Sequence, residues 1–392
     1  MRVTARTELP NELWFEIFKH LSRDTLRSVH GVSSLFHAIS HPLFFRDFVL
    51  DPDRHDHEFI QRLNMYSSAP IANHVRKLCV SFRFGRWFRR DGRSFTSPNS
   101  PNPLLVPLLQ AIPCFQNLRI LECSFRSSTF TAENYTAPHN LTGSKIRVVH
   151  FFFTAIPEII LERRREGESR RSFLSILDPE TLRSLTLSPS YDCSPAAWLA
   201  YDRDLFATFR NLSSVNIGCD GPFLREVHTF LVQLPALQHL TLTGSHRRFR
   251  EFAPSPDGET LSSGLQSYTG PCEYIPIFLR GTSCTRLAIN ACCTPDELRD
   301  ALEDTSCTGA VRDISLRFSL AGACGWKSPQ ELFALLPLLI SLELGISDSP
   351  LEDDDSDVFE AAEIFDPATL SDLPDILGAV LRAPPAPQAC GD

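Results

Sequence analysis

The chain has 392 residues and a formal net charge of −9, with 43% hydrophobic and 22% charged residues. This composition is typical of globular proteins and excludes a fibrous or wholly disordered chain. The apolar stretches reach about ten residues, whereas a bilayer span needs roughly 20, so we expect no transmembrane helix. The first residues lack the apolar run of a signal peptide, so we expect a cytoplasmic and/or nuclear protein.

The charge and the cysteines are unevenly distributed. Residues 328–381 contain 13 acidic residues and neither Lys nor Arg, so the remaining sequence is mildly basic. The 12 cysteines form no CxxC pair, and several of them lie in apolar runs. This usage favours small buried side chains in a reducing compartment over a zinc site.

Three short helices are predicted within the first fifty residues. The first begins near Pro10, because proline suits the first position of a helix. The second covers residues 25–30, and the third begins near Val32 and ends at Pro42. Helices this short cannot bury their apolar surface among themselves, so they either pack on the rest of the chain or await a partner. The apolar stripe of the first helix consists of Leu13, Ile17, Phe18 and Leu21.

The order of residues in this segment resembles the F-box motif. Residues 9–21 read L-P-x-E-L-x3-I-F-x2-L, and residues 41–45 (HPLFF) are similar to the ending of fungal F-box proteins. In that family the motif binds the Skp-type adaptor of cullin–RING ubiquitin ligases. The resemblance therefore implies an adaptor-binding surface made of Leu9, Pro10, Leu13, Ile17, Leu21, Leu26, Val32 and Phe36.

The pattern L-x2-L-x-L recurs through residues 71–347 at steps that surround the 20–29 residue period of leucine-rich repeats. Alternation within L-x-L turns two side chains inward on a short strand, and one repeat cannot close that core alone. Weaker copies occupy residues 146–151, 265–268 and 287–289. The region resembles the leucine-rich repeat solenoids that often follow an F-box. The central residues of the clear copies are Leu78, Leu121, Leu185, Val215, Leu240, Ile314 and Leu342.

Helix-start signals lie between several repeats. Residues 294–297 (TPDE) and 328–331 (SPQE) read as capping boxes, and residues 220–222 (DGP) precede an apolar helical stripe. Strand, turn and helix in repetition predict an α/β solenoid rather than a doubly wound sheet. We expect a three-helix F-box (7–50), a connector (51–70), an irregular leucine-rich-repeat-like horseshoe (71–347) and an acidic, Pro/Ala-rich, partly disordered tail (348–392).

A target would bind on the strand residues that face away from the core. Most of these residues are small and polar, and the face carries no aromatic anchor. A solvated face without a partner is the alternative. The candidate target-binding residues are Thr186, Asn216, His239, Thr241, Arg286, Asp313, Arg317 and Glu343.

Enzyme motifs are missing from the sequence. It contains no G-x-S-x-G, no P-loop and no G-x-G-x2-G, and we find no nucleophile with a matching base. Residues 55–58 (HDHE) offer metal-ligand types but fall in the predicted connector. We therefore expect no catalytic residue, no metal and no cofactor.

These features predict a substrate-recognition subunit of an SCF-type (Skp–cullin–F-box) ubiquitin ligase. Its partners would be a Skp-type adaptor, through it a cullin, and an unknown target protein, with no membrane partner. One alternative is an interaction scaffold without a ligase role. The other is a nucleic-acid or chromatin-associated binder that uses the arginine-rich residues 83–93 and 163–171.

Overall fold

The computed structural model describes residues 9–50, 56–81, 105–125, 145–153, 177–188, 208–219, 224–243, 260–293, 295–303, 305–319 and 335–347. The chain divides into two compact units, residues 1–198 and residues 199–392. Each unit is described by itself.

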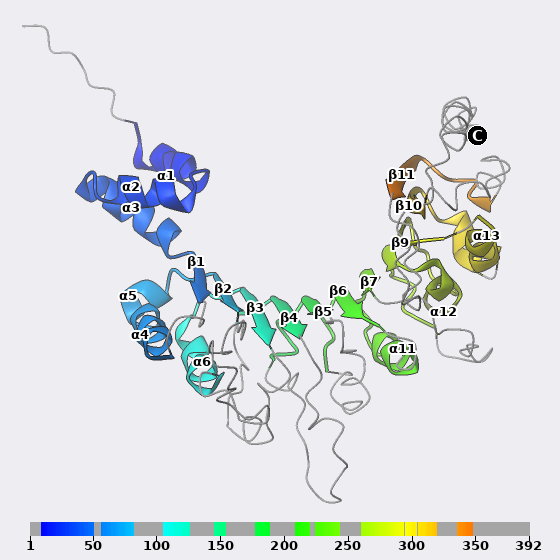
Figure 1. The fold of residues 1–392 in the computed structure, drawn as a ribbon, viewed down its shortest axis with the longest axis horizontal. Helices are drawn as coiled ribbons and strands as arrows, with labels where there is room; N and C mark the ends of the chain where they lie inside the picture. Colours follow the sequence, from blue (N-terminus) through cyan, green and yellow to red (C-terminus); the bar gives the residue numbers. More distant parts are fainter. Residues whose placement is uncertain are drawn as a thin grey trace, which may run out of the picture. The chain divides into compact units, whose positions relative to one another are not determined.

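The first unit begins with short helices and continues with five strands, of which the first three are separated by helices (Figure 1). Its helices are α1 (Asn11–Lys19), α2 (Arg23–His30), α3 (Ser34–Phe44), α4 (Asp56–Tyr66), α5 (Ala69–Ala72), α6 (Leu105–Ala111) and the 3-10 turn η1 (Ile112–Cys114). Its strands are β1 (Asp47–Leu50), β2 (Lys77–Ser81), β3 (Ile120–Phe125), β4 (Val148–Phe153) and β5 (Ser184–Ser188).

The five strands of the first unit pair in parallel and in chain order. One residue of each strand forms a continuous row through the sheet, and every member of that row is buried. Each repeat therefore closes its core against its neighbours, as in a solenoid. The row, in register, is Phe48, Leu78, Leu121, Val149 and Leu185.

Two elements of this unit differ from the sequence prediction. Strand β1 is a further copy of the repeat, with Phe45 and Phe48 in the positions where the other copies carry aliphatic residues. Helix α4 occupies most of the segment predicted as a connector and buries Phe59 and Leu63. The ring of Tyr66, at the end of α4, stacks on that of Phe48 with centroids 3.5 Å apart. The repeat architecture thus begins at residue 47, ahead of the predicted residue 71.

The first helix begins next to Pro10, as predicted, whereas Pro42 does not end the third helix. Pro10 precedes α1, and its carbonyl accepts hydrogen bonds from the amides of Leu13 and Trp14. Pro42 does not end α3, which continues to Phe44. A proline near the end of a helix removes one amide, and the last turn still closes because the Phe45 amide donates to the His41 carbonyl at 3.2 Å.

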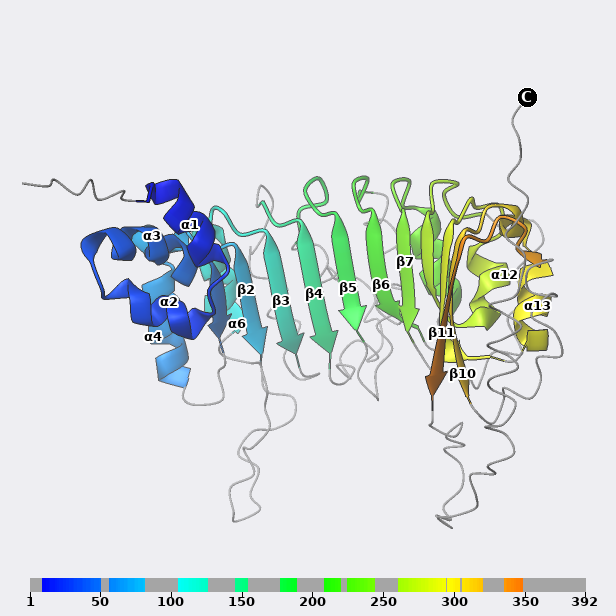
Figure 2. The ribbon, with the colours of Figure 1, turned by 90° about the horizontal axis from the view of Figure 1, so that it is seen from above.

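The second unit repeats the same plan with six parallel strands in chain order (Figure 2). Its strands are β6 (Ser214–Gly218), β7 (His239–Thr243), β8 (Ser267–Gly270), β9 (Arg286–Cys292), β10 (Asp313–Ser319) and β11 (Ser341–Ser347). Its helices are α11 (Leu224–Val232), α12 (Ile275–Phe278), α13 (Pro295–Glu303) and the 3-10 turns η5 (Cys272–Tyr274) and η6 (Ser306–Gly309).

Two of the helix starts predicted for this unit agree with the structure. Helix α13 begins at Pro295, as its capping sequence predicts. Helix α11 follows residues 220–222 and buries Leu224, Val227 and Phe230 on one face. The third start signal, residues 328–331, lies outside the described residues, as does the whole predicted tail, residues 348–392.

The fold is α/β, with parallel strands that follow chain order in each unit and helices that cover one face of the strands. This arrangement is compatible with a solenoid. Eight cysteines within the described ranges are free, and five of the six buried ones among them lie in the second unit. Within the described residues, no helix is both long and apolar enough to cross a membrane.

Gly270 is the strand residue whose replacement tests the packing of the second unit. A Cβ atom there would lie 2.5 Å from the Tyr268 hydroxyl and 3.3 Å from the Leu242 Cβ. We expect Gly270→Ala to lower the free energy of unfolding by about 1–3 kcal/mol, because the core around Tyr268 leaves no room. Urea unfolding followed by circular dichroism measures this loss.

Two further variants identify the cause. Gly264→Ala is the matched control, because its nearest neighbour outside the adjacent residues is 3.4 Å away. Adding Tyr268→Ala to Gly270→Ala removes both the hydroxyl and the Cζ atom, which would lie 2.5 and 2.7 Å from the new Cβ, so the double variant should lose less stability than the sum of the single ones. Strictly additive losses would contradict this account.

Candidate functional site

Two serine caps define the N-terminal helices α1–α3. Ser22 Oγ accepts a hydrogen bond from the Thr25 amide at 3.2 Å, and Ser33 Oγ accepts one from the Phe36 amide at 3.1 Å. Each bond satisfies an amide that the first turn of a helix leaves without a partner. The caps therefore fix where α2 and α3 begin, and with them the short turn that joins these helices.

A small aromatic core holds the three helices together. Phe18, Leu26 and Ile39 are buried at its centre. The Phe36 ring lies 4.9 Å from the Trp14 ring and 5.1 Å from the Phe18 ring, measured between centroids. These tilted and edge-on contacts join α1 to α3.

The structure divides the eight adaptor-binding candidates into an exposed and an inward group. Leu26 is 6% exposed and belongs to the helix core, while Leu21 and Phe36 are half-buried against that core. These three residues pack in or against the helix core and are not available to a partner as the exposed candidates are. The exposed candidates are Leu9, Pro10, Leu13, Ile17 and Val32.

Leu35 is an exposed apolar residue that the adaptor-binding prediction did not include. It lies on the first turn of α3, three residues after Val32. An apolar residue in a predicted helix does not by itself tell whether it faces the core or solvent. We call Leu9, Leu13, Ile17, Val32 and Leu35 the exposed apolar set.

The exposed apolar set is unusual for the surface of a small helical group. Leu13 is 48% exposed, Ile17 is 43% exposed and Val32 is 66% exposed. Burying one such side chain fully contributes about 1.5–3 kcal/mol, so these residues gain free energy if a partner covers them. Groups of exposed apolar residues mark interaction sites more often than scattered ones do.

Four histidines gather where α2, α3 and the turn before β2 meet. The His30 ring lies 4.1 Å from the His37 ring, and the His41 ring lies 5.3 Å from the His74 ring. Ser40 Oγ donates to the Phe36 carbonyl at 2.6 Å and therefore accepts from His30 Nδ1–H at 2.9 Å.

Burial and the neighbouring imidazoles lower the pKa of two of these histidines. For His30 the causes are partial burial and then the charge of His37. For His41 they are partial burial and then the charges of His74, His37 and His30. Both effects favour the neutral form of His30 and His41.

The candidate target-binding residues lie on strands, and the structure gives them very different exposures. Thr186, on β5 of the first unit, is buried and offers little to a partner. Asn216 and Thr241 are half-buried, and the buried Asn216 Oδ1 has no hydrogen-bond partner among the described residues. Asp313 is also half-buried. The residues classed as exposed are His239, Arg286, Arg317 and Glu343.

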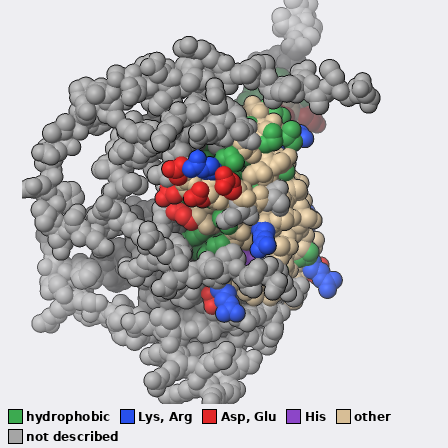
Figure 3. All heavy atoms as spheres, turned by 90° about the vertical axis from the view of Figure 1, so that its right-hand side faces the viewer, with side chains coloured by type: hydrophobic (Ala, Val, Ile, Leu, Met, Phe, Trp, Pro, Cys, Tyr) green, Lys and Arg blue, Asp and Glu red, His purple; other side chains and the backbone are tan. Residues whose placement is uncertain are grey.

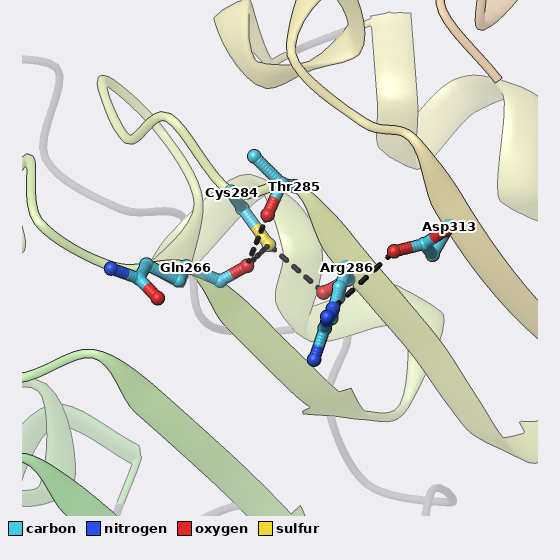
Figure 4. Close-up of polar contacts among 5 residues, drawn as sticks. All are labelled: Gln266, Cys284, Thr285, Arg286 and Asp313. Atoms are coloured by element: carbon cyan, nitrogen blue, oxygen red, sulfur yellow. Dashed lines mark hydrogen bonds and ion pairs between the residues drawn. The ribbon is translucent and has the colours of Figure 1, made fainter. Parts of the chain in front are cut away.

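Arg286 and Asp313 meet across β9 and β10 (Figure 4). Arg286 Nε lies 3.3 Å from Asp313 Oδ2, and the side chains of the two residues are 73% and 44% exposed. Next to this pair, the Cys284 thiol donates to the Arg286 carbonyl and the Thr285 hydroxyl donates to the Gln266 carbonyl. An exposed ion pair contributes little to stability, so it remains open to exchange with a partner's charges.

Lys77, Cys79 and Glu122 form a polar cluster on the first unit that the sequence analysis did not predict. Glu122 Oε1 lies 2.8 Å from Lys77 Nζ, and Glu122 Oε2 accepts a hydrogen bond from the Cys79 thiol at 2.8 Å. Burial alone would raise the pKa of Glu122, but the bonds from Cys79 and Lys77 and the positive charges nearby hold it below its usual value. Burial and the bond to Glu122 raise the pKa of Cys79 to about 12. Only the register of β2 and β3 brings these residues together.

Within the described part of the second unit, helix α13 carries several exposed acidic residues. Figure 3 shows acidic side chains gathered beside a basic one on one face of the molecule. Arg299 forms an ion pair with Asp296 one turn away. Such a face is ordinary for a solvated helix. The exposed acidic residues of α13 are Asp296, Glu297, Asp300 and Glu303.

Within the described ranges, no group of three His, Cys, Asp or Glu side chains is arranged to hold a metal ion. Of residues 55–58, Asp56, His57 and Glu58 lie in the first turn of α4, and His55 lies outside the described residues.

The thiol of Cys79 should react slowly with alkylating reagents. Its raised pKa leaves little thiolate at pH 8, whereas Cys114 is exposed. We expect iodoacetamide to label Cys79 at least about tenfold more slowly than Cys114, as measured by peptide mass spectrometry over time. Glu122→Gln removes a nearby negative charge and should speed the labelling of Cys79. An unchanged rate would show that burial alone protects the thiol.

The histidine cluster should make the first unit sensitive to acid. The pKa values of His30 and His41 lie below their ordinary value of 6.5 in the folded chain, so the unfolded chain takes up protons first as the pH falls. Stability is therefore full above about pH 6.5 and declines below it. The midpoint of urea unfolding should fall less between pH 7.5 and 5.5 in His37→Gln/His74→Gln than in the wild type.

The control for this experiment is His20→Gln, because His20 is exposed at the end of α1 and outside the cluster. It should keep the full acid dependence of the wild type. An equal pH dependence in all three proteins would exclude the charges of His37 and His74 as its source and leave burial as the cause.

Comparisons with known proteins do not extend these observations. A scan of the chain against protein-family models finds no matching family, and a search of curated proteins finds no matching relative.

Proposed function

We propose that this protein is the substrate-recognition subunit of an SCF-type ubiquitin ligase. In this role α1–α3 dock on a Skp-type adaptor, and the strand-bearing part of the chain binds a target protein. The chain contributes positioning rather than chemistry: it raises the effective concentration of the target's lysines near the ubiquitin-conjugating enzyme.

The exposure of Leu9, Leu13, Ile17 and Val32 is the single observation that carries this proposal. These are residues that the F-box resemblance assigns to adaptor contact, and they remain open to solvent next to a well-packed helix core. If the helices only packed on the rest of the chain, these side chains would be buried. A partner surface of apolar character fits them best.

The other part of the proposal concerns the strand face. His239, Arg286, Arg317 and Glu343 present exposed side chains of both charges. A surface of this kind suits a polar target, with specificity set by charge complementarity rather than by a large apolar anchor.

One alternative is an interaction scaffold without a ligase role, and binding to a Skp-type adaptor distinguishes the two. The nucleic-acid alternative relies on residues 83–93 and 163–171, which lie outside the described residues.

The test is co-expression of the full chain with a Skp-type adaptor. We expect the wild type to co-purify with the adaptor in a stoichiometric complex. Leu13→Asp/Ile17→Asp should weaken this complex about 100-fold or more, because it buries two charges in an apolar interface. Leu21 is unsuitable for this purpose, since its half-buried side chain packs on the helix core.

The matched control is Ile60→Asp/Met65→Asp on α4. These side chains are 36% and 49% exposed, close to those of the test pair, but lie outside α1–α3. The control should bind the adaptor like the wild type. A soluble wild type that binds no adaptor would refute the ligase role and favour the scaffold.

A further inference from the structure

Five arginines occupy one register position in the first unit. In each repeat an arginine directly precedes the strand, so the same position is basic from β1 to β5. The signal in the sequence is an arginine after the first apolar residue of the repeat, as in Leu118-Arg119 and Leu182-Arg183. The members of this arginine column are Arg46, Arg76, Arg119, Arg147 and Arg183.

Backbone hydrogen bonds place these residues in a line. The amide of Arg76 donates to the Arg46 carbonyl, that of Arg119 to the Arg76 carbonyl, that of Arg147 to the Arg119 carbonyl and that of Arg183 to the Arg147 carbonyl, each at 2.8 Å. Neighbouring strands in a sheet are about 4.8 Å apart, so the column extends for roughly 19 Å along the edge where the strands begin.

All five arginines are exposed. Arg46, Arg76, Arg119 and Arg147 form no ion pair with a described side chain, although Asp47 directly follows Arg46. Like charges in adjacent register positions repel each other, and this repulsion is relieved when an anion binds between them. The corresponding positions of the second unit are mostly uncharged: Ser213, Gln238, Gln266, Thr285, Arg312 and Ile340.

We infer that the arginine column binds an extended acidic segment of a partner protein. Guanidinium groups bind carboxylates in a bidentate manner, which a row of arginines offers repeatedly. An extended chain rises about 3.3 Å per residue, so roughly six residues cover the column. The identification of that partner with a ligase target rests on the proposed function, whereas the binding of an acidic peptide does not.

An acidic peptide fits the column better than single-stranded nucleic acid does. Nucleic-acid binders without sequence preference combine basic grooves with aromatic side chains on which bases stack. The strand residues that follow the arginines are Asp47, Lys77, Ile120, Val148 and Ser184, none of which is aromatic. Among the residues that precede the arginines, Phe45 alone is aromatic, and its half-buried ring lies against that of Tyr66.

The test measures binding of the full chain to a fluorescent peptide of six glutamates by anisotropy, at 50 and 300 mM salt. We expect binding that weakens with salt and that a peptide of six glutamines does not show. Arg76→Gln/Arg119→Gln/Arg147→Gln should weaken binding of the glutamate peptide about tenfold. These side chains are exposed, and circular dichroism confirms that the variant folds.

The matched control is Arg210→Gln/Arg225→Gln/Arg280→Gln, which removes the same charge from exposed positions of the second unit. It should change the affinity less than about twofold. Equal weakening in both triple variants would reduce the effect to net charge and overturn the inference, as would tighter binding of a hexanucleotide than of the peptide.

The adaptor experiment separates this inference from the proposed function. The arginine variant should still co-purify with the Skp-type adaptor, because the column lies outside α1–α3. Peptide binding by a chain that binds no adaptor would retain the acidic-peptide site and refute the ligase role. Adaptor binding without peptide binding would support the ligase role and refute the acidic-peptide site.

Discussion

The buried row of one apolar residue per strand is the interaction on which the rest of the structure depends. A single repeat has a short strand and, at most, a short helix, and it cannot enclose its own apolar side chains. Leu78 becomes fully buried because Phe48 and Leu121 lie on either side of it in register. Register is fixed by this row, since a shift of one residue would turn every apolar side chain to solvent.

Fixed register has a chemical consequence, because it repeats every other position of the repeat along the sheet. It brings Lys77, Cys79 and Glu122 into contact from two strands that are far apart in the chain. Because the register is fixed, the arginines that precede the strands also lie side by side and form the arginine column. The polar cluster and the arginine column are therefore formed by residues at matching register positions of neighbouring strands, and they come together only when the strands pair.

The N-terminal helices follow a different principle. Their core is small and aromatic, and it leaves Leu13, Ile17 and Val32 exposed while it buries Phe18 and Leu26. A long repeat region can bury almost all its apolar strand residues because each repeat has neighbours. Three short helices have too little interior to do so, and their unburied surface is what a partner would stabilise.

The sequence by itself determined the repeat and its strands, because apolar residues at L-x2-L-x-L spacing leave only one face to bury. It also determined the start of α13 and the buried face of α11 through local cap chemistry and periodicity. Strand β1 escaped detection because phenylalanine replaces the expected aliphatic residues, and α4 escaped because its polar beginning is typical of a connector.

Tertiary structure alone decided which members of an apolar stripe face solvent. Leu26 and Ile17 both fit the F-box pattern, yet packing buries the first and exposes the second. It also decided the contacts between distant residues, such as the histidine cluster and the arginine column. Periodicity reports the face of one element, whereas contact between elements depends on how their faces are paired in space.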